Sequence, residues 1–256
     1  MTDTIRYEFP LNERIRIFCR LELLFEQLAY FSADDSVFSR RAAVTALLDI
    51  LTIFSRNDLK SEVLKELERQ IAIFNQWLNA EGVDGDKVSA YLAQLKALSQ
   101  RLYSSNGKIG LKVMANDLFQ SVSQRSAIPG GTCSFDLPAY HFWLEQPSQM
   151  QQQALDQWLS PFADIREGIA LALSFIRQSG VLQDYVAEAG FMQMGLDRSQ
   201  PIQMIQVCLA QSMDCYAEIS GGKHRFTVRF MRPGRDGSRA AQAEQNIPFK
   251  LSFCQF

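Results

Sequence analysis

A change in hydrophobic period near residue 183 constrains the fold of this chain more than any other feature. Before it, apolar residues recur every three or four positions, as Leu67, Ile71 and Phe74 do within the segment from Leu59 to Leu78. That spacing predicts amphipathic helices. After it, apolar and polar residues alternate, most strictly from Arg225 to Met231, which predicts strands with one buried face. We therefore expect an α+β protein: a mainly α-helical domain with a smaller antiparallel β-rich domain.

The helical patterns and their breaks set the expected boundaries. Helices are expected over residues 13–28, 37–54, 59–78, 88–102, 117–124, 148–159 and 161–178, and the third and fourth are expected to form a helical hairpin. Prolines and paired glycines from Ile128 to Pro138 exclude regular helix and indicate a shaped loop or a short strand. The predicted helical domain comprises residues 1–127 and 139–180, and the predicted β-rich domain comprises residues 128–138 and 181–256.

Composition limits the partners and the compartment. The 26 Lys and Arg residues nearly balance the 28 Asp and Glu residues, so the net charge of -2 gives no global attraction to nucleic acid or to an anionic membrane. Five cysteines without a CxxC pair indicate reduced thiols that are mostly buried. A signal peptide and any run of ~20 apolar residues are missing. We expect a cytoplasmic protein without direct membrane insertion.

Motifs of catalysis and cofactor binding are missing from the sequence. It has two histidines, His141 and His224, and no HExxH, Walker A or GxSxG pattern. Cys133 and His141 could pair as nucleophile and base. However, Cys133 lies among small and apolar residues, as a buried thiol would, and no orienting acid is evident. We expect no catalytic residue, metal or cofactor, and a cysteine-dependent enzyme centred on Cys133 stays an alternative.

Basic residues gather on one predicted strand. Lys223, Arg225, Arg229 and Arg232 lie within ten positions, and the period of two places Arg225 and Arg229 on the face opposite Phe226. The planar fork of arginine holds carboxylates through paired hydrogen bonds, so this strand is expected to bind an acidic peptide of a partner protein. An ordinary solvated sheet face is the competing interpretation.

A nucleic-acid-binding module that uses the basic strands is a further alternative. Such a module would stack bases on aromatic side chains, for which Phe226, Phe230 and Phe249 are the candidates. The alternation places Phe226 and Phe230 on the face opposite the arginines. We therefore expect no nucleic-acid partner.

Three stretches of the sequence resemble the ZapD family of Z-ring-associated bacterial cell division proteins. They are Pro10 to Glu13 leading into Arg20, Ile128 to Pro138 followed by His141 and Trp143, and Ile219 to Gly221 followed by Arg225 to Met231. The resemblance covers nearly the whole chain. It implies a non-enzymatic homodimer at the mid-cell division site that binds the C-terminal tail of FtsZ, the tubulin-like division GTPase. It also implies that the dimer cross-links and bundles FtsZ filaments, which stabilises the Z-ring and supports division septum assembly.

The resemblance also implies a site made of positively charged surface residues. The matching positions are Arg20, Arg56, Arg125, His141, Arg225 and Arg229, and the strand pattern adds Lys223 and Arg232 as neighbours. Near Asn116 and Asp117, where the family carries a basic residue, this chain is neutral and then acidic. We therefore do not expect the basic surface to extend through that helix.

Overall fold

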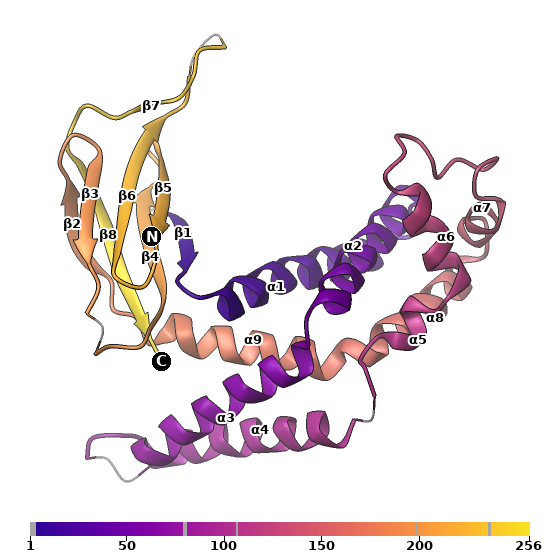
Figure 1. Ribbon diagram of the computed structural model, residues 1–256, viewed down its shortest axis with the longest axis horizontal. Helices are drawn as coiled ribbons and strands as arrows, with labels where there is room; N and C mark the ends of the chain where they lie inside the picture. The colour runs from indigo at the N-terminus through magenta and orange to yellow at the C-terminus, as the bar shows by residue number, and fades with distance from the viewer. Residues whose placement is uncertain (1–3, 79–80, 106, 198, 235–236) are drawn as a thin grey trace. The chain divides into compact units, whose positions relative to one another are not determined.

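The chain folds into helices and antiparallel sheets. The computed structural model describes residues 4–78, 81–105, 107–197, 199–234 and 237–256. The chain begins with a strand, continues through a long run of helices and ends in a series of strands (Figure 1). Two four-stranded antiparallel sheets accompany the helices. The α+β prediction is confirmed.

The helices begin and end close to the predicted positions. Their bounds are α1 Glu13–Ser32, α2 Val37–Arg56, α3 Leu59–Trp77, α4 Gly85–Ser104, α5 Leu111–Met114, α6 Asp117–Arg125, α7 Pro138–Leu144, α8 Ser148–Leu159 and α9 Ala163–Gln178, with a 3-10 turn η1 at Ser160–Phe162. Side chains cap several of them. Asp58 accepts a hydrogen bond from the Ser61 N–H at the start of α3, and Asp84 accepts one from the Lys87 N–H at the start of α4.

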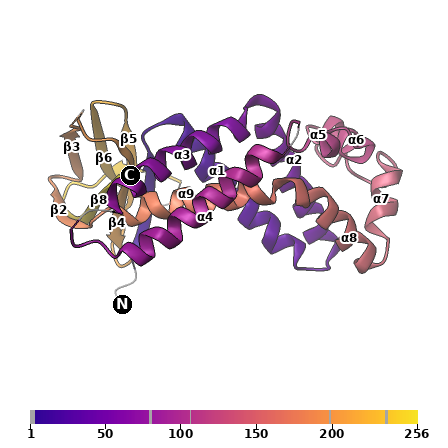
Figure 2. The same cartoon turned by 90° about the horizontal axis from the view of Figure 1, so that it is seen from below.

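Helices α3 and α4 form the predicted hairpin. They lie side by side in both views of the chain (Figures 1 and 2). Leu67 of α3 and Leu95 of α4 are fully buried, and the ring of Phe74 lies 5.9 Å from that of Tyr91. The apolar stripe that predicts α3 from sequence is therefore its packing face.

Two helical segments differ from the prediction because of prolines. Pro138 begins α7, which the sequence analysis did not predict, since proline is favoured in a first helical turn, where its missing N–H is not needed. Pro161 lies in η1, so α9 begins at Ala163, later than predicted. Between α6 and α7 the chain makes consecutive turns without a strand. Of the two alternatives for Ile128 to Pro138, the structure has the loop.

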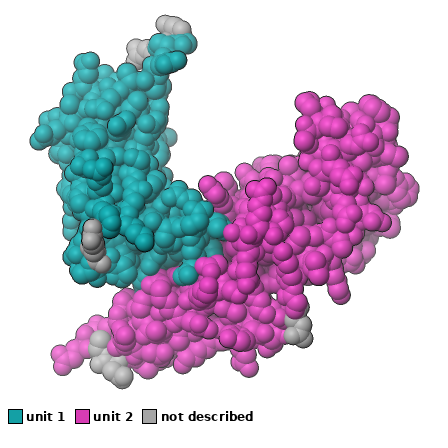
Figure 3. All heavy atoms as spheres, in the orientation of Figure 1, with its two compact units in different colours: residues 1–19, 172–256 teal, residues 20–171 magenta. Residues whose placement is uncertain are grey.

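The chain divides into two compact units (Figure 3). Unit 1 contains the described residues up to Cys19 and those from Ala172 onward, and unit 2 runs from Arg20 to Leu171. The unit boundaries fall inside α1 and α9 and therefore do not mark independently folding parts of the chain. The predicted domain boundaries stay a prediction.

The strands of unit 1 form two sheets. Their bounds are β1 Thr4–Pro10, β2 Gln183–Ala187, β3 Phe191–Gly195, β4 Ile202–Ala210, β5 Tyr216–Gly221, β6 Arg225–Arg232, β7 Ala241–Gln242 and β8 Ile247–Gln255. One sheet, sheet A, has the order β1-β4-β8-β2. The other, sheet B, has the order β3-β6-β5, and β7 pairs with the end of β6.

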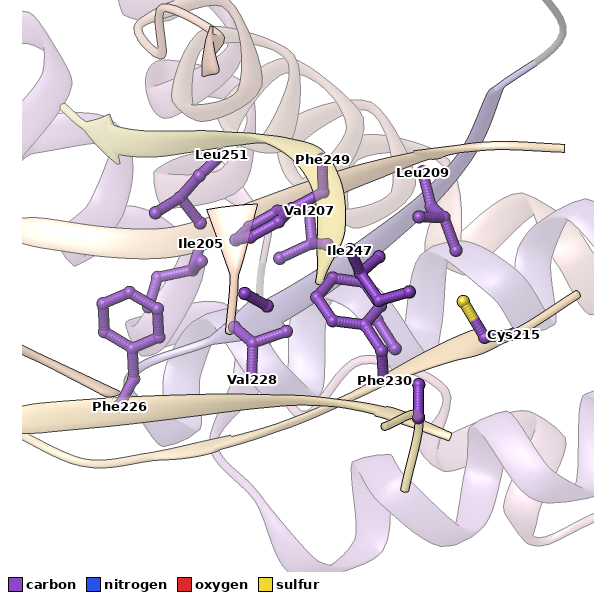
Figure 4. Close-up of a cluster of buried hydrophobic side chains, with 13 residues drawn as sticks. Ile205, Val207, Leu209, Cys215, Phe226, Val228, Phe230, Ile247, Phe249 and Leu251 are labelled. Carbon is purple, nitrogen blue, oxygen red and sulfur yellow. The ribbon is translucent and has the colours of Figure 1, made fainter. Parts of the chain in front are cut away.

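The core of unit 1 lies between the inner faces of sheets A and B. Figure 4 shows Phe226 and Val228 of β6 pointing towards Ile205 and Val207 of β4. These side chains are fully buried, as is Phe230 of β6. The predicted alternation along β6 is confirmed, and it fixes the direction in which the arginines of this strand point.

Two features of the sheets escaped the sequence analysis. Strand β1 was not predicted, although Ile5, Tyr7 and Phe9 alternate with polar residues, and it pairs with β4 over its whole length. The chain from residue 183 to residue 195 forms two strands, β2 and β3, because it reverses at Gly190 with φ 69°. A Cβ at Gly190 would lie 2.5 Å from the backbone oxygen of Ala243, so only glycine fits there.

Candidate partner-binding site

The outer face of sheet B carries the predicted basic strand. We call the surface formed by Lys223, Arg225, Thr227 and Arg229 the basic face. Arg225 and Arg229 are exposed on β6, and Phe226, Val228 and Phe230 between and beside them are buried. Because neighbouring side chains of a strand point to opposite faces, the arginines are held outward by the residues that anchor the strand inward.

The side chain of Arg225 lies between two glycines. Gly195 of β3 is its register partner on one side. On the other side, Gly222 donates its N–H to the Arg225 carbonyl at 3.0 Å. Neither neighbour has a side chain that could cover the guanidinium on this face. Arg225 is therefore open to a ligand from both directions along the sheet.

Arg229 has two different neighbours across the strands. Phe191 of β3 lies opposite it on one side and Glu218 of β5 on the other. Within the described part of the chain, neither Arg225 nor Arg229 forms an ion pair, and Glu218 forms none either. The acid beside Arg229 thus reduces the positive potential of the basic face without occupying the guanidinium.

A shallow depression of about 450 Å³ follows the basic face. The residues around it are mostly polar or basic: Gln193, Ser220, Gly221, Gly222, Lys223, His224, Arg225, Phe226, Thr227 and Arg229. In its middle the hydroxyls of Ser220 and Thr227 lie 2.7 Å apart and satisfy each other. A groove of this kind suits a polar, acidic chain segment better than a small apolar ligand.

Lys223 and Arg232 lie at opposite ends of the strand and are oriented differently. Lys223 is exposed in the turn before β6 and lines the depression. Arg232 lies two and six positions after Phe230 and Phe226, and alternate residues of a strand point to the same face. Its side chain therefore leaves the strand on the side of the core. Burial raises the pKa of the nearby Cys215 thiol, and the positive charge of Arg232 opposes that rise. The structure thus brings Lys223 together with Arg225 and Arg229 but turns Arg232 away.

The other predicted residues belong to the helices of unit 2. Arg20 is exposed on α1. Arg56 is exposed at the end of α2, where it lines a depression of about 440 Å³ with Lys60 and Lys108. The Nζ atom of Lys60 donates to the Ser105 carbonyl at 2.6 Å and that of Lys108 to the Ser55 carbonyl at 3.3 Å. Sequence pattern alone does not place Lys60 and Lys108 beside Arg56, since only folding brings their segments together.

Arg125 and His141 have acidic neighbours already. Arg125 Nη1 lies 3.3 Å from Asp136 Oδ1, and His141 Nδ1 lies 3.9 Å from Glu145 Oε1. Across the described ranges, no hydrogen bond or ion pair joins Arg20, Arg56, Arg125 and His141 to one another. A partner that bound Arg125 would have to compete with Asp136.

Three of the five cysteines are buried, as predicted for most of them, and Cys19 is partly buried. Cys208, Cys215 and Cys254 are buried, whereas Cys133 is exposed, so the expectation of a buried thiol at that position is wrong. Cys133 lies in the turns before α7. No hydrogen bond between described residues joins Cys133 to His141, whose nearest charged partner is Glu145.

Neither a metal-binding cluster nor a membrane-spanning helix is present among the described residues. They contain no cluster of three or more side chains with metal-binding chemistry. None of the described helices has the length and apolarity required to cross a bilayer. The rings of Phe226 and Phe230 are buried, so neither offers bases a stacking surface beside the arginines.

Comparison with known proteins gives the family. A family model described as ZapD, cell division protein, matches residues 19–229. The chain belongs to the ZapD family. Cell division protein ZapD of Methylococcus capsulatus is 44% identical over 254 residues, which cover 99% of each protein. Its namesakes in Nitrosomonas eutropha and Dechloromonas aromatica are 38% and 36% identical, over 98% of this chain and 99% of each relative. The chain is therefore similar to ZapD proteins over almost its entire length and has a role in cell division.

Proposed function

We propose that this ZapD family protein binds the C-terminal tail of FtsZ through the basic face and acts without catalysis. The observation that carries the proposal is the pair Arg225 and Arg229: both are exposed on one face of β6, and neither has an ion-pair partner among the described residues. Each guanidinium has donors free for a carboxylate of the tail. Their fork geometry favours paired hydrogen bonds over a single contact.

Dimerisation would convert tail binding into filament bundling. We infer that a homodimer of this chain carries two copies of the basic face, each holding the tail of a different FtsZ filament at the mid-cell division site in the cytoplasm. One such contact between exposed charges is weak. Many contacts between the same two filaments add through effective concentration, so weak single sites suffice for a stable bundle and a stabilised Z-ring.

The residues of unit 2 have a secondary place in the proposal. Arg20 and Arg56 are exposed and are candidates for further contacts with FtsZ, with Lys60 and Lys108 beside Arg56. Arg125 and His141 stay candidates as well, although each has an acid nearby. Arg232 is the weakest candidate because its side chain leaves β6 towards the core side.

A pull-down with the FtsZ C-terminal peptide tests the proposal. The Arg225→Glu, Arg229→Glu double variant should retain at least about tenfold less peptide than the unmodified protein, because two attractive contacts become repulsive. The variant should fold normally, since both side chains are exposed and the inner face of β6 is untouched. Cosedimentation with FtsZ filaments should show the same loss of bundling.

A charge-matched control separates a local effect from a change in net charge. Lys87→Glu with Lys96→Glu on α4 makes the same change of net charge at exposed positions of unit 2. This control should retain the peptide as the unmodified protein does. If the double variant and the unmodified protein retain equal amounts of peptide, the basic face is not the binding site for the tail.

A further inference from the structure

The outer edge of β3 presents backbone groups without a strand partner. β3 ends the strand order of sheet B. Leu196 donates its N–H to the His224 carbonyl at 2.8 Å, and Gly190 accepts from the Phe230 N–H at 2.8 Å. Hydrogen-bonded and non-bonded pairs alternate in an antiparallel ladder, so the even-numbered residues of β3 bond to β6. The odd-numbered residues therefore point their N–H and C=O groups away from the sheet. Of these, Phe191 donates its N–H to the Glu188 carbonyl at 2.9 Å, which leaves Gln193 and Gly195.

These edge groups have no hydrogen-bond partner within the ranges that the structure describes. None of the backbone or side-chain hydrogen bonds there involves the N–H or C=O of Gln193 or Gly195. A row of unpaired N–H and C=O groups is a template on which an extended peptide can add a strand. The edge of β3 is thus equipped to bind a backbone as well as side chains.

Charge distinguishes this edge from the other end of sheet B. β5 carries Glu218, which forms no ion pair among the described residues, whereas β3 has no acid between Phe191 and Gly195. An acidic peptide would meet this carboxylate on β5. On β3 it meets the edge that lies directly beside the basic face.

The arginines can reach across β3 to such a peptide. An added strand would lie about 4.8 Å beyond β3 and about 10 Å from β6. Gly195 is the register partner of Arg225, and a Cβ built on it would meet only the His224 backbone oxygen, at 3.9 Å. The space above Gly195 is therefore open, and an extended Arg225 side chain can pass over it. Phe191, which is 36% exposed, offers an apolar contact next to Arg229.

We propose that the acidic peptide binds as an additional β-strand on the free edge of β3. Its backbone bonds to Gln193 and Gly195, and its alternate side chains carry carboxylates to the basic face. This inference rests on the proposed function, because it takes the FtsZ tail as the acidic peptide. What it adds is the way in which the peptide binds. It also defines the ligand chemistry: an extended segment with acidic residues at alternate positions and no proline where the edge needs an N–H.

A pair of substitutions at Gln193 tests the binding mode. Gln193→Pro removes an edge N–H that β6 does not use and blocks the approach of a new strand, and proline is tolerated at such edge positions. Gln193→Ala removes the same side chain and keeps the N–H. In titrations with the tail peptide, the proline variant should bind at least about tenfold more weakly than the alanine variant, because both lack the Gln193 side chain and only the alanine variant keeps the N–H.

Amide hydrogen exchange on the unmodified protein supplies a second measurement that depends on no variant. The Gln193 and Gly195 amides should exchange fast in the free protein and at least about tenfold more slowly with saturating peptide, because they become hydrogen-bonded. The Met192 and Met194 amides already bond to β6 and should change little. Unchanged exchange at both edge amides would overturn the inference, including in the case that the proline variant fails to fold.

The outcomes separate this inference from the proposed function. If Gln193→Pro binds normally while Arg225→Glu, Arg229→Glu does not, side chains alone hold the tail and only the strand-addition inference is overturned. If both variants bind normally, the proposed function fails as well. If Gln193→Pro changes the sedimentation coefficient of the protein without peptide, the edge is a contact between copies of this chain, and the inference is likewise overturned.

Discussion

Three arginines of the helices differ from Arg225 and Arg229 of β6 in whether they form an ion pair with a carboxylate of the chain. Arg40, Arg101 and Arg125 each form an ion pair within the chain. Arg225 and Arg229 form none in the part of the chain that the structure describes. An arginine that holds an internal acid supports the fold, and one that holds none has its donors free for the acid of another molecule.

Burial strengthens the contrast. The Arg40 side chain is only 1% exposed, and it donates to Asp35, to the Ser32 carbonyl and to Gln152 on α8. These partners satisfy its two terminal amino groups, while its buried Nε has no hydrogen-bond partner among the described residues. On β6 the solvent satisfies the guanidinium, so a ligand carboxylate displaces water and breaks no internal bond.

The largest effect that we expect from this contrast is on stability. Arg40→Ala should lower the free energy of unfolding by about 3 kcal/mol, because it deletes a buried side chain together with its hydrogen bonds to Ser32, Asp35 and Gln152. Arg225→Ala should change it by less than about 0.5 kcal/mol, as exposed substitutions usually do. Urea unfolding of both variants checks the two values. Similar losses of unfolding free energy in the two variants would contradict the difference between the buried Arg40 and the exposed Arg225.

Salt should affect tail binding next most strongly. Between about 0.1 M and about 1 M salt the Debye length falls from about 10 Å to about 3 Å, which screens exposed charges. Binding of the FtsZ tail peptide should weaken about tenfold over this range, a size expected of a few exposed charge pairs. Fluorescence anisotropy of a labelled peptide measures the affinity. A flat salt profile would mean that apolar contacts or buried ion pairs hold the tail.

The stability that a helix-capping acid contributes should depend on pH. Hydrogen bonds from the Ser61 hydroxyl and N–H lower the pKa of the Asp58 carboxyl. A lowered folded-state pKa gives stability that is complete above the unfolded value of about 3.9 and is lost as the pH falls through the folded value. Asp58→Ala should cost about 1 kcal/mol at pH 7, and this cost should shrink as the pH falls below about 4. A cost that stayed constant down to pH 2 would exclude the capping carboxylate as its cause.

The smallest expected effect concerns the acid beside Arg229. Glu218→Gln removes a negative charge from the basic face and keeps the shape of the side chain. The affinity for the tail peptide should rise about twofold to fivefold, since an exposed charge pair contributes up to about 1 kcal/mol. Asp184→Asn on β2 of sheet A is the matched control and should leave the affinity unchanged. A fall in affinity in Glu218→Gln would show that Glu218 itself contacts the tail.

The parts of the fold that local pattern determines were predictable from sequence. The stripe of α3 and the alternation of β6 each have one dominant period, and both elements lie where they were predicted. β1 shows the same alternation but is short and lies far in sequence from β4, its partner, so pattern alone gave it little weight. The exposed Cys133 was mispredicted because apolar neighbours in sequence do not bury a residue when the chain around it makes turns.

The candidate site was predictable only along one strand. Alternation identified Arg225 and Arg229 as neighbours on one face. The same pattern also predicts that the Arg232 side chain points to the opposite face. What the sequence could not supply is the register between strands. Only the pairing of β3 with β6 places Gly195 next to Arg225 and leaves the edge of β3 without a partner strand.

A charge-swap titration tests the central claim most directly. Two peptides are compared: the FtsZ C-terminal tail, and the same tail with each Asp and Glu replaced by Lys. The unmodified protein should bind the first peptide and should not bind the second. The Arg225→Glu, Arg229→Glu double variant should not bind the first peptide but should bind the second, because the charge of the basic face is reversed. If the double variant keeps its affinity for the natural tail, or the unmodified protein binds both peptides alike, the basic face is not the site at which FtsZ is recognised.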